Sequence, residues 1–347
     1  MNNVPKVLVF PITYRCNSKC IMCTIWQRKL ENELTLKEIS DLFNDPTLSE
    51  NVESINITGG EPTLREDFNE IIEVIVEKSP KLREIGVNSN GFNTENVLEK
   101  VLKAAELMSS KKKRLNVYIS LDGLREIHDK VRGVKGGFEK AWTTIQKLKE
   151  SEKKYADFHV HLNCTINKLN YNQLMKIRQF ARKNDIALGY TFAMITDIYI
   201  KSEEVKDNFA LEESQKKEVI AFLDELINNP KRLAISRFYF ESLKNMIEGN
   251  ERAIPCIFPQ NGCFLEPDGT LRICGTSDKL IFGNIRKKAF TELWDSKKAD
   301  GARKLAEDKI CKKCETNCYV DWSDEVKEKI KKLKEEQKNE NSNNNSK

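Results

Sequence analysis

The chain has 347 residues, of which 39% are hydrophobic and 32% charged, as in a globular protein with a charged surface. It contains no run of 18 apolar residues and no signal-peptide cleavage pattern, so we expect a cytoplasmic protein without a membrane span. The net charge of +5 does not indicate a nucleic-acid-binding protein. Ten cysteines in such a chain favour metal binding over disulfides, because cytoplasmic thiols stay reduced.

Six apolar, β-branched runs alternate with six amphipathic stretches in the first two thirds of the chain. The runs lie near residues 6–12, 54–58, 84–88, 116–121, 158–166 and 187–193. The amphipathic stretches lie near residues 35–44, 66–78, 93–108, 137–149, 170–184 and 211–228. Repeated strand–helix units predict an α/β fold with a parallel sheet. Six units are fewer than the eight of a complete barrel, so we expect a partial (β/α)6 TIM barrel, with a doubly wound sheet as the alternative.

Composition divides the chain into four parts. We expect the barrel over residues 1–229, with its site at the carboxyl ends of the strands. A helical bridge is expected over 230–255. A small Cys-rich α+β module follows over 256–322, because six of the ten cysteines lie there. The remainder, 323–347, is a charged helix that runs into an Asn- and Ser-rich tail, which we expect to be disordered.

Three cysteines follow the first predicted strand with the spacing Cys16-x3-Cys20-x2-Cys23. At this cysteine content, two fixed partners follow a given Cys by chance about once in a thousand cases. Thiolates on one loop suit an iron–sulfur cube, and three of them leave one iron open. A structural zinc site would need a fourth ligand nearby, and none follows in the sequence.

Polar and glycine-rich turns follow the next strands. Gly59-Gly60-Glu61-Pro62 ends the second strand, where the glycines would let the backbone approach a ligand and Glu61 could hold an ammonium group. The alternative is a plain glycine turn in which Glu61 is a cap. Asn88-Ser89-Asn90-Gly91 ends the third strand. Ser120 and Asp122 end the fourth, two residues apart and so on one strand face.

The cysteine triad resembles that of the radical S-adenosylmethionine (SAM) superfamily, although Met22 stands where an aromatic residue is common. In that family one electron cleaves SAM on the open iron, and a 5′-deoxyadenosyl radical takes a hydrogen atom from the substrate. The later turns resemble the family's SAM-binding elements, and for Arg132 the alternative is a helix-surface charge. The resemblance implies a SAM site formed by Gly59, Gly60, Glu61, Pro62, Asn90, Ser120, Asp122, Arg132 and Asn163.

Two histidines, His159 and His161, share one face of the predicted fifth strand with Asn163. A metal site there is less favoured than a neutral, hydrogen-bonded pair. Cys164, on the opposite face, predicts a buried structural thiol.

The C-terminal cysteines surround a Pro267-Asp268-Gly269 turn, which predicts a hairpin. The pattern resembles the SPASM/twitch module of radical SAM enzymes, and its cysteine pool is Cys256, Cys263, Cys274, Cys311, Cys314 and Cys318. A full module has seven cysteines, so we expect one auxiliary [4Fe–4S] cluster here. Its ligands would be Cys274, Cys311 and Cys314 with either Cys256 or Cys263. A zinc ribbon that uses Cys263 is the alternative.

The resemblance implies an enzyme that modifies a ribosomally synthesised peptide, with a flavodoxin or ferredoxin-type electron donor. No leader-binding domain is expected before the first strand, so a separate protein would bind the leader. The alternatives are a small-molecule dehydrogenase or cofactor-biosynthesis enzyme, and a non-catalytic iron–sulfur or zinc protein. A thiol left over, Cys256 or Cys318, is a candidate hydrogen donor. Substrate contacts are expected from Tyr190, Phe192 and Asp197.

Overall fold

The computed structural model describes residues 3–28, 31–193, 196–198, 203–231, 233, 237–252 and 256–314. The predicted C-terminal helix and tail and the thiol of Cys318 lie outside the described residues.

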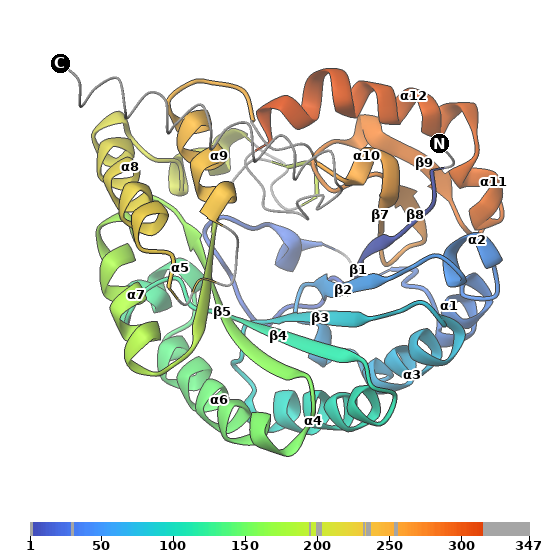
Figure 1. Cartoon of the computed structure of the whole chain (residues 1–347), viewed down its shortest axis with the longest axis horizontal. Helices are drawn as coiled ribbons and strands as arrows, with labels where there is room; N and C mark the ends of the chain where they lie inside the picture. The colour runs from blue at the N-terminus through green and yellow to red at the C-terminus, as the bar shows by residue number, and fades with distance from the viewer. Residues whose placement is uncertain are drawn as a thin grey trace, which may run out of the picture.

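One sheet runs through the molecule, with the strand order β6-β5-β4-β3-β2-β1-β7-β8-β9 (Figure 1). The first six strands are β1 (Val7–Thr13), β2 (Ser54–Gly59), β3 (Glu84–Ser89), β4 (Arg114–Ser120), β5 (Phe158–Ile166) and β6 (Ala187–Phe192). They pair in parallel, each with the strand before it. The order never reverses, as it would in a doubly wound sheet, so the predicted partial barrel is confirmed.

Helices cover the outer face of this curved sheet (Figure 1). Those that follow the strands are α1 (Leu36–Leu42), α2 (Pro46–Ser49), α3 (Phe68–Lys78), α4 (Thr94–Ser110), α5 (Glu126–Arg132), α6 (Gly137–Ser151), α7 (Leu174–Lys183) and α8 (Glu213–Asn228). Capping residues determine where two of these helices begin. Thr35 and Glu38 form a capping box at α1, and Asn93 caps α4. In the predicted bridge, α9 (Arg237–Ile247) packs against α8.

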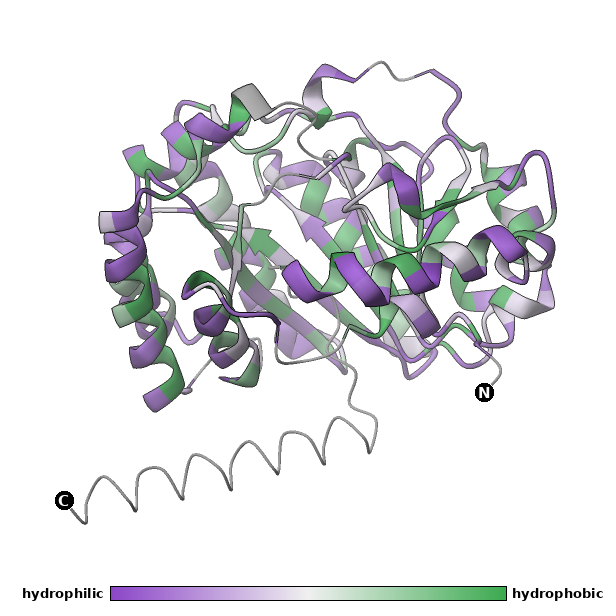
Figure 2. Ribbon diagram, turned by 90° about the horizontal axis from the view of Figure 1, so that it is seen from above, coloured by the Kyte–Doolittle hydropathy of each residue, from purple (hydrophilic) through white to green (hydrophobic). Residues whose placement is uncertain are grey.

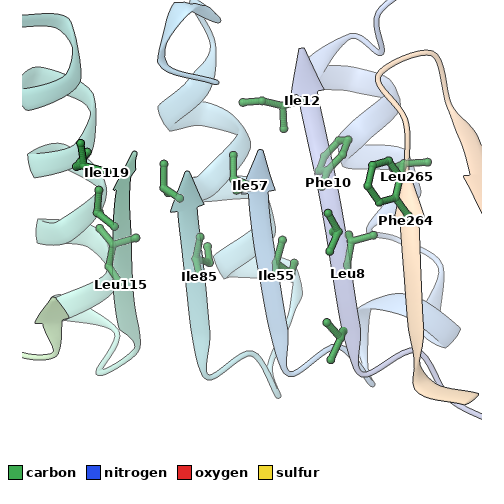
Figure 3. Close-up of a cluster of buried hydrophobic side chains, with 14 of the residues drawn as sticks. Leu8, Phe10, Ile12, Ile55, Ile57, Ile85, Leu115, Ile119, Phe264 and Leu265 are labelled. Carbon is green, nitrogen blue, oxygen red and sulfur yellow. The ribbon is translucent and has the colours of Figure 1, made fainter. Parts of the chain in front are cut away.

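The two faces of the barrel sheet differ in polarity. Apolar side chains such as Leu8, Phe10 and Ile57 form the core on the helix side (Figure 3). Hydrophobic and hydrophilic residues alternate along the helices, as expected for helices with one buried face (Figure 2). On the opposite face the His161 Nε2 lies 3.2 Å from the side-chain amide oxygen of Asn116, and burial lowers the pKa of His161 to about 4. The histidine is therefore neutral, as expected for a hydrogen-bonded strand residue.

The C-terminal module extends the barrel sheet. Its strands are β7 (Gly262–Leu265), β8 (Thr270–Arg272) and β9 (Ile281–Asn284), and its helices are α10 (Phe258–Asn261), α11 (Phe290–Trp294) and α12 (Lys297–Leu305). Strand β7 pairs in parallel with β1, in a register that aligns Leu8 with Cys263. The sequence predicts the hairpin turn, and Gly269 has the expected positive φ of 86°. It does not predict the pairing with β1, which places the module beside the cysteine loop.

Candidate functional site

The loop after β1 carries Cys16, Cys20 and Cys23, and each sulfur has a hydrogen-bond donor. The backbone N–H of Ser18 donates to Cys16, and that of Ile25 donates to Cys23. Arg132 Nη1 donates to the Cys20 sulfur at 3.7 Å, and the Ser18 hydroxyl, which donates to the Arg132 carbonyl, lies 3.0 Å from the same sulfur. Donors of this kind stabilise thiolates that ligate iron. The loop therefore suits a cluster held by three thiolates.

Burial raises the pKa values of both Cys16 and Cys23 to about 12, while the positive charge of Arg132 acts in the opposite direction. These thiols therefore keep their protons until a metal displaces them. Within the described residues, no three Cys, His, Asp or Glu side chains converge closely enough to hold a single metal ion. An iron–sulfur cube does not need that convergence, because each thiolate binds a different iron.

The two glycines of the turn after β2 contact the cysteine loop. The Gly60 N–H donates to the Thr13 carbonyl at 2.9 Å, and the Glu61 N–H donates to the Arg15 carbonyl at 2.7 Å. A Cβ on Gly59 or Gly60 would lie 2.1 Å from one of these carbonyl oxygens. We expected the glycines to admit a ligand. In the structure they instead allow the backbone of the cysteine loop to pack against this turn, which fixes the base of the loop.

Replacing Gly60 with alanine is therefore expected to displace the cysteine loop. The new methyl would overlap backbone atoms, which cannot rotate away, so the substitution should cost about 1–3 kcal/mol or more. Gly301→Ala is the matched control, because its Cβ meets nothing within 4 Å in helix α12. Iron retention during gel filtration measures the effect. Gly60→Ala should lose iron from the loop, and equal retention in both variants would contradict this account.

Glu61 is buried, with 1% of its surface exposed, and its carboxylate is fully hydrogen-bonded. One oxygen accepts from the N–H and hydroxyl of Thr63, and the other from the Ser89 hydroxyl and the Asn90 N–H. Burial raises the pKa of Glu61, and these hydrogen bonds oppose the rise. The carboxylate thus has no lone pair left for the SAM ammonium. It is a cap that ties this turn to the end of β3, and Pro62 continues the turn as a buried 3-10 residue.

Asn90 also makes its side-chain contacts within the protein. Its amide nitrogen donates to the Asn17 side chain at 2.6 Å, and its amide oxygen accepts from the Phe92 N–H at 2.9 Å. Asn90 therefore joins the end of β3 to the cysteine loop. Asn90 lies at the predicted site, but both polar atoms of its side chain already form hydrogen bonds within the protein.

Asp122 and Arg132 form a buried ion pair, with 2.5 Å between the Asp122 Oδ2 and the Arg132 Nε. The other Asp122 oxygen accepts from the Thr165 N–H at 2.7 Å. The Asp122 N–H donates to His128 Nδ1, and burial lowers the pKa of His128 to about 3, which keeps the ring neutral. Arg132 Nη1 lies 3.7 Å from the Cys20 sulfur. The helix-surface alternative for Arg132 is wrong, because its side chain is only 12% exposed.

Ser120 and Asn163 differ from these occupied residues. They are register partners on β4 and β5, and both are half-buried on the polar face of the sheet. Neither side chain makes a hydrogen bond within the described part of the chain, and the same holds for Thr58 at the end of β2. These three groups are available to a ligand. Thr58 was not predicted from the sequence as a ligand-binding residue. Its position at the end of a strand, two residues before Gly60, is the feature that could have indicated this role.

Four C-terminal cysteines lie close together. Cys311 is hydrogen-bonded to Cys256, and its pKa is raised by that contact and by Cys274 and Cys314. The Thr276 hydroxyl lies 3.0 Å from the Cys274 sulfur. The four thiols come from the start of the module, the end of the hairpin and the Cys311–Cys314 turn. Together they form a donor set for one cluster.

Cys263 lies apart from that donor set. It is fully buried in β7, with its sulfur 3.8 Å from the Val7 carbonyl oxygen. The charge that acts on its thiol is that of Arg303, not of another cysteine. The fourth nearby thiol is therefore Cys256. The zinc-ribbon alternative, which used Cys263, has no geometric basis in this structure.

Two residues predicted to contact substrate face the helices instead. The Tyr190 hydroxyl donates to the Leu174 carbonyl, and its ring packs against Phe222 and Phe240. Phe192, two residues on, shares this face and is 8% exposed. The prediction for both is wrong because β6 presents its odd-numbered residues to the polar face. Cys164, aligned with Tyr190 in the sheet, is buried as expected.

A buried charge network, the Glu266 bridge, joins the cysteine loop to the C-terminal hairpin. Glu266, after β7, accepts a 2.8 Å hydrogen bond from the Tyr14 hydroxyl and pairs with Arg28 at 3.6 Å. Its second oxygen pairs with Arg272, which also binds Asp278 at 2.8 Å. Tyr14 and Arg28 flank the three cysteines of the loop, and Arg272 lies two residues before Cys274. One carboxylate thus connects both thiol sets.

Asp197, predicted to contact substrate, also belongs to this junction. Its carboxylate accepts from the Asp278 N–H at 2.5 Å, and its carbonyl accepts from Arg28 at 3.2 Å. Residues 197–198 thereby contact both the cysteine loop and the hairpin.

Comparisons with known proteins agree with this arrangement. A family model described as the radical SAM superfamily matches residues 10–181, and one described as a SPASM iron–sulfur cluster-binding domain matches residues 256–319. The Fe-coproporphyrin III synthase of Methanosarcina barkeri is 29% identical over 83% of this chain and 73% of its own length. The sporulation killing factor maturation protein SkfB of Bacillus subtilis is 30% identical over 50% of this chain and 39% of its own length.

The fold is similar to that of anSMEcpe with bound AdoMet and the Cp18Cys peptide, with a TM-score of 0.63 and 22% identity. The similarity covers 89% of this chain and 86% of that chain. Among the described residues, no helix is long and apolar enough to cross a membrane.

Proposed function

This chain belongs to the radical SAM superfamily, and from that premise we propose that it abstracts a hydrogen atom from a peptide substrate. The observation that supports the reaction class is the donor-supported triad of Cys16, Cys20 and Cys23, beside strand ends with free polar groups. When bound, the cluster supplies the electron that cleaves SAM, and the resulting 5′-deoxyadenosyl radical takes the hydrogen atom.

The chain's own residues have two kinds of role in this proposal. Glu61 and Asn90 fix the turns around the cysteine loop, since their polar atoms are bonded within the protein. Ser120, Asn163 and Thr58 offer neutral donors and acceptors to the polar groups of SAM. The expected electron donor is a flavodoxin or ferredoxin.

The C-terminal thiols are proposed to hold one auxiliary [4Fe–4S] cluster, with Cys256, Cys274, Cys311 and Cys314 as ligands. These thiols are mutually close, and a hydroxyl supports one of them. The module that carries them lies beside β1.

Iron analysis after anaerobic reconstitution tests the auxiliary site. The wild type should bind about eight irons per chain, and Cys311→Ser with Cys314→Ser should bind about four. Cys263→Ala is the matched control, because that thiol lies outside the set and should leave iron content unchanged. About twelve irons in the wild type would contradict a single auxiliary cluster. About four would indicate that the C-terminal module binds a metal other than iron.

Two observations support a peptide substrate. SkfB, a maturation protein by name, is 30% identical where it matches. In addition, the buried guanidinium groups near the cysteine loop are already paired, Arg132 with Asp122 and Arg28 with Glu266. They offer little to a substrate with many carboxylates.

A cofactor precursor is the second candidate substrate. The observation in its favour is the match to Fe-coproporphyrin III synthase, which extends over 83% of this chain. Such a substrate would be a small molecule, not a peptide.

Deuterium transfer separates the two substrate classes. Reconstituted enzyme, SAM and dithionite are incubated with the peptide fraction or the small-molecule fraction of deuterium-grown cells of the source organism. Because the abstracted atom ends on 5′-deoxyadenosine, mass spectrometry of that product reports the fraction that holds the substrate. We expect labelled product with the peptide fraction. Label with only the small-molecule fraction would overturn the peptide proposal and favour the second candidate.

A further inference from the structure

Arg132 reaches the cysteine loop from the C-terminal end of α5, and its backbone anchors it there. Its carbonyl accepts from the Lys19 N–H at 3.0 Å and from the Ser18 hydroxyl at 2.9 Å. The next residue, Gly133, packs so closely that a Cβ on it would lie 2.4 Å from the Lys19 carbonyl oxygen. The end of α5 and the cysteine loop are therefore one rigid unit.

The guanidinium group of Arg132 is held on two sides. Its Nε faces the Asp122 carboxylate at 2.5 Å, and its Nη1 lies 3.7 Å from the Cys20 sulfur. The Asp122 side chain has no exposed surface and is itself fixed by the Thr165 N–H. Removing one of the two side chains would leave the charge of the other buried without its partner.

Given the function proposed above, we propose that the Asp122–Arg132 pair sets the reduction potential of the cluster on Cys16, Cys20 and Cys23, acting through the Cys20 thiolate. A cation next to a ligating sulfur stabilises the reduced cluster, which carries more negative charge. Asp122 offsets part of that cation. Arg132 and Asp122 are thus positioning residues with opposite electrostatic effects on the same cluster.

The sulfurs of the loop differ in the donors they receive. Cys16 and Cys23 accept from backbone N–H groups, whereas Cys20 contacts the side chains of Ser18 and Arg132. Side-chain donors can be changed by mutation without altering the loop backbone. Cys20 is therefore the ligand through which the chain can adjust the cluster.

The test is an EPR-monitored redox titration of reconstituted protein without SAM. Arg132→Met should shift the potential of the loop cluster to more negative values, and Asp122→Asn should shift it to more positive values. Arg132→Lys keeps the charge and should lie between Arg132→Met and the wild type. The auxiliary cluster serves as an internal reference, and its potential should not move.

Two results would overturn the inference. Shifts of the same sign in Arg132→Met and Asp122→Asn would show that the pair acts only through structure. An unchanged potential with lost SAM binding in Arg132→Met would show that Arg132 binds SAM. If Arg132→Met fails to retain its cluster, Arg132→Lys is the second variant, and its potential should still lie below that of the wild type. Failure of the proposed function itself looks different, since wild-type protein would then show no response of its EPR signal to SAM.

Discussion

Alanine in place of Cys16, Cys20 or Cys23 should remove the loop cluster and abolish 5′-deoxyadenosine formation. Two thiolates do not hold an iron–sulfur cube that already has one open iron, so iron should fall from about eight to about four per chain. The loss should be all-or-none, because the backbone N–H donors of the loop support sulfur ligands and cannot replace them. Iron analysis and the EPR signal of the reduced protein measure it.

Cys164→Ala is the matched control for these three variants. This thiol is equally free and more deeply buried, but it lies on the helix-facing side of β5. Its removal should cost about 1 kcal/mol of stability and no iron. A loop variant that kept all its iron, or a Cys164→Ala protein that lost half of it, would contradict the assignment of the loop.

Glu266→Gln should cause a large loss of stability although it keeps the shape of the side chain. Glu266 is the carboxylate that both Arg28 and Arg272 share, and the Arg272 side chain is only 4% exposed. Without that carboxylate, two guanidinium charges lose their shared buried partner. Breaking a buried ion pair from one side costs about 3–5 kcal/mol. The free energy of unfolding, from denaturant titration of the full chain, should fall by about that amount.

Glu53→Gln is the control for this prediction, because Glu53 pairs with Lys6 and Arg83 at the surface. Exposed pairs contribute about 0–1 kcal/mol, so the control should lose little stability. If Glu266→Gln is as stable as Glu53→Gln, the Glu266 bridge does not hold the cysteine loop to the hairpin.

The features that the sequence predicts correctly depend on local patterns. The strands and helices of the barrel follow from the alternation of apolar and amphipathic stretches, and the cysteine loop follows from spacing alone. The burial of Cys164 follows from the period-two rule of a strand. The substrate contact expected from Tyr190, which was inferred from its position on the sixth strand, is wrong because the sequence does not say which parity of β6 faces the helices.

The features that the sequence does not predict depend on contacts between distant segments. Tyr14 and Glu266 lie 252 positions apart, and no local pattern indicates that they share a hydrogen bond. The pairing of β7 with β1 is equally non-local. Glu61 shows a second limit of what a sequence predicts. Its residue type and place agreed with the prediction, but four local donors had already satisfied its carboxylate, which only side-chain geometry reveals.

Formation of 5′-deoxyadenosine tests the central claim most directly. The chain is reconstituted with iron and sulfide without oxygen, its iron content is measured, and dithionite and SAM are then added. The account predicts that 5′-deoxyadenosine appears in the wild type and is absent from Cys16→Ala. Fully iron-loaded wild-type protein that yields no 5′-deoxyadenosine would contradict the claim that this site cleaves SAM.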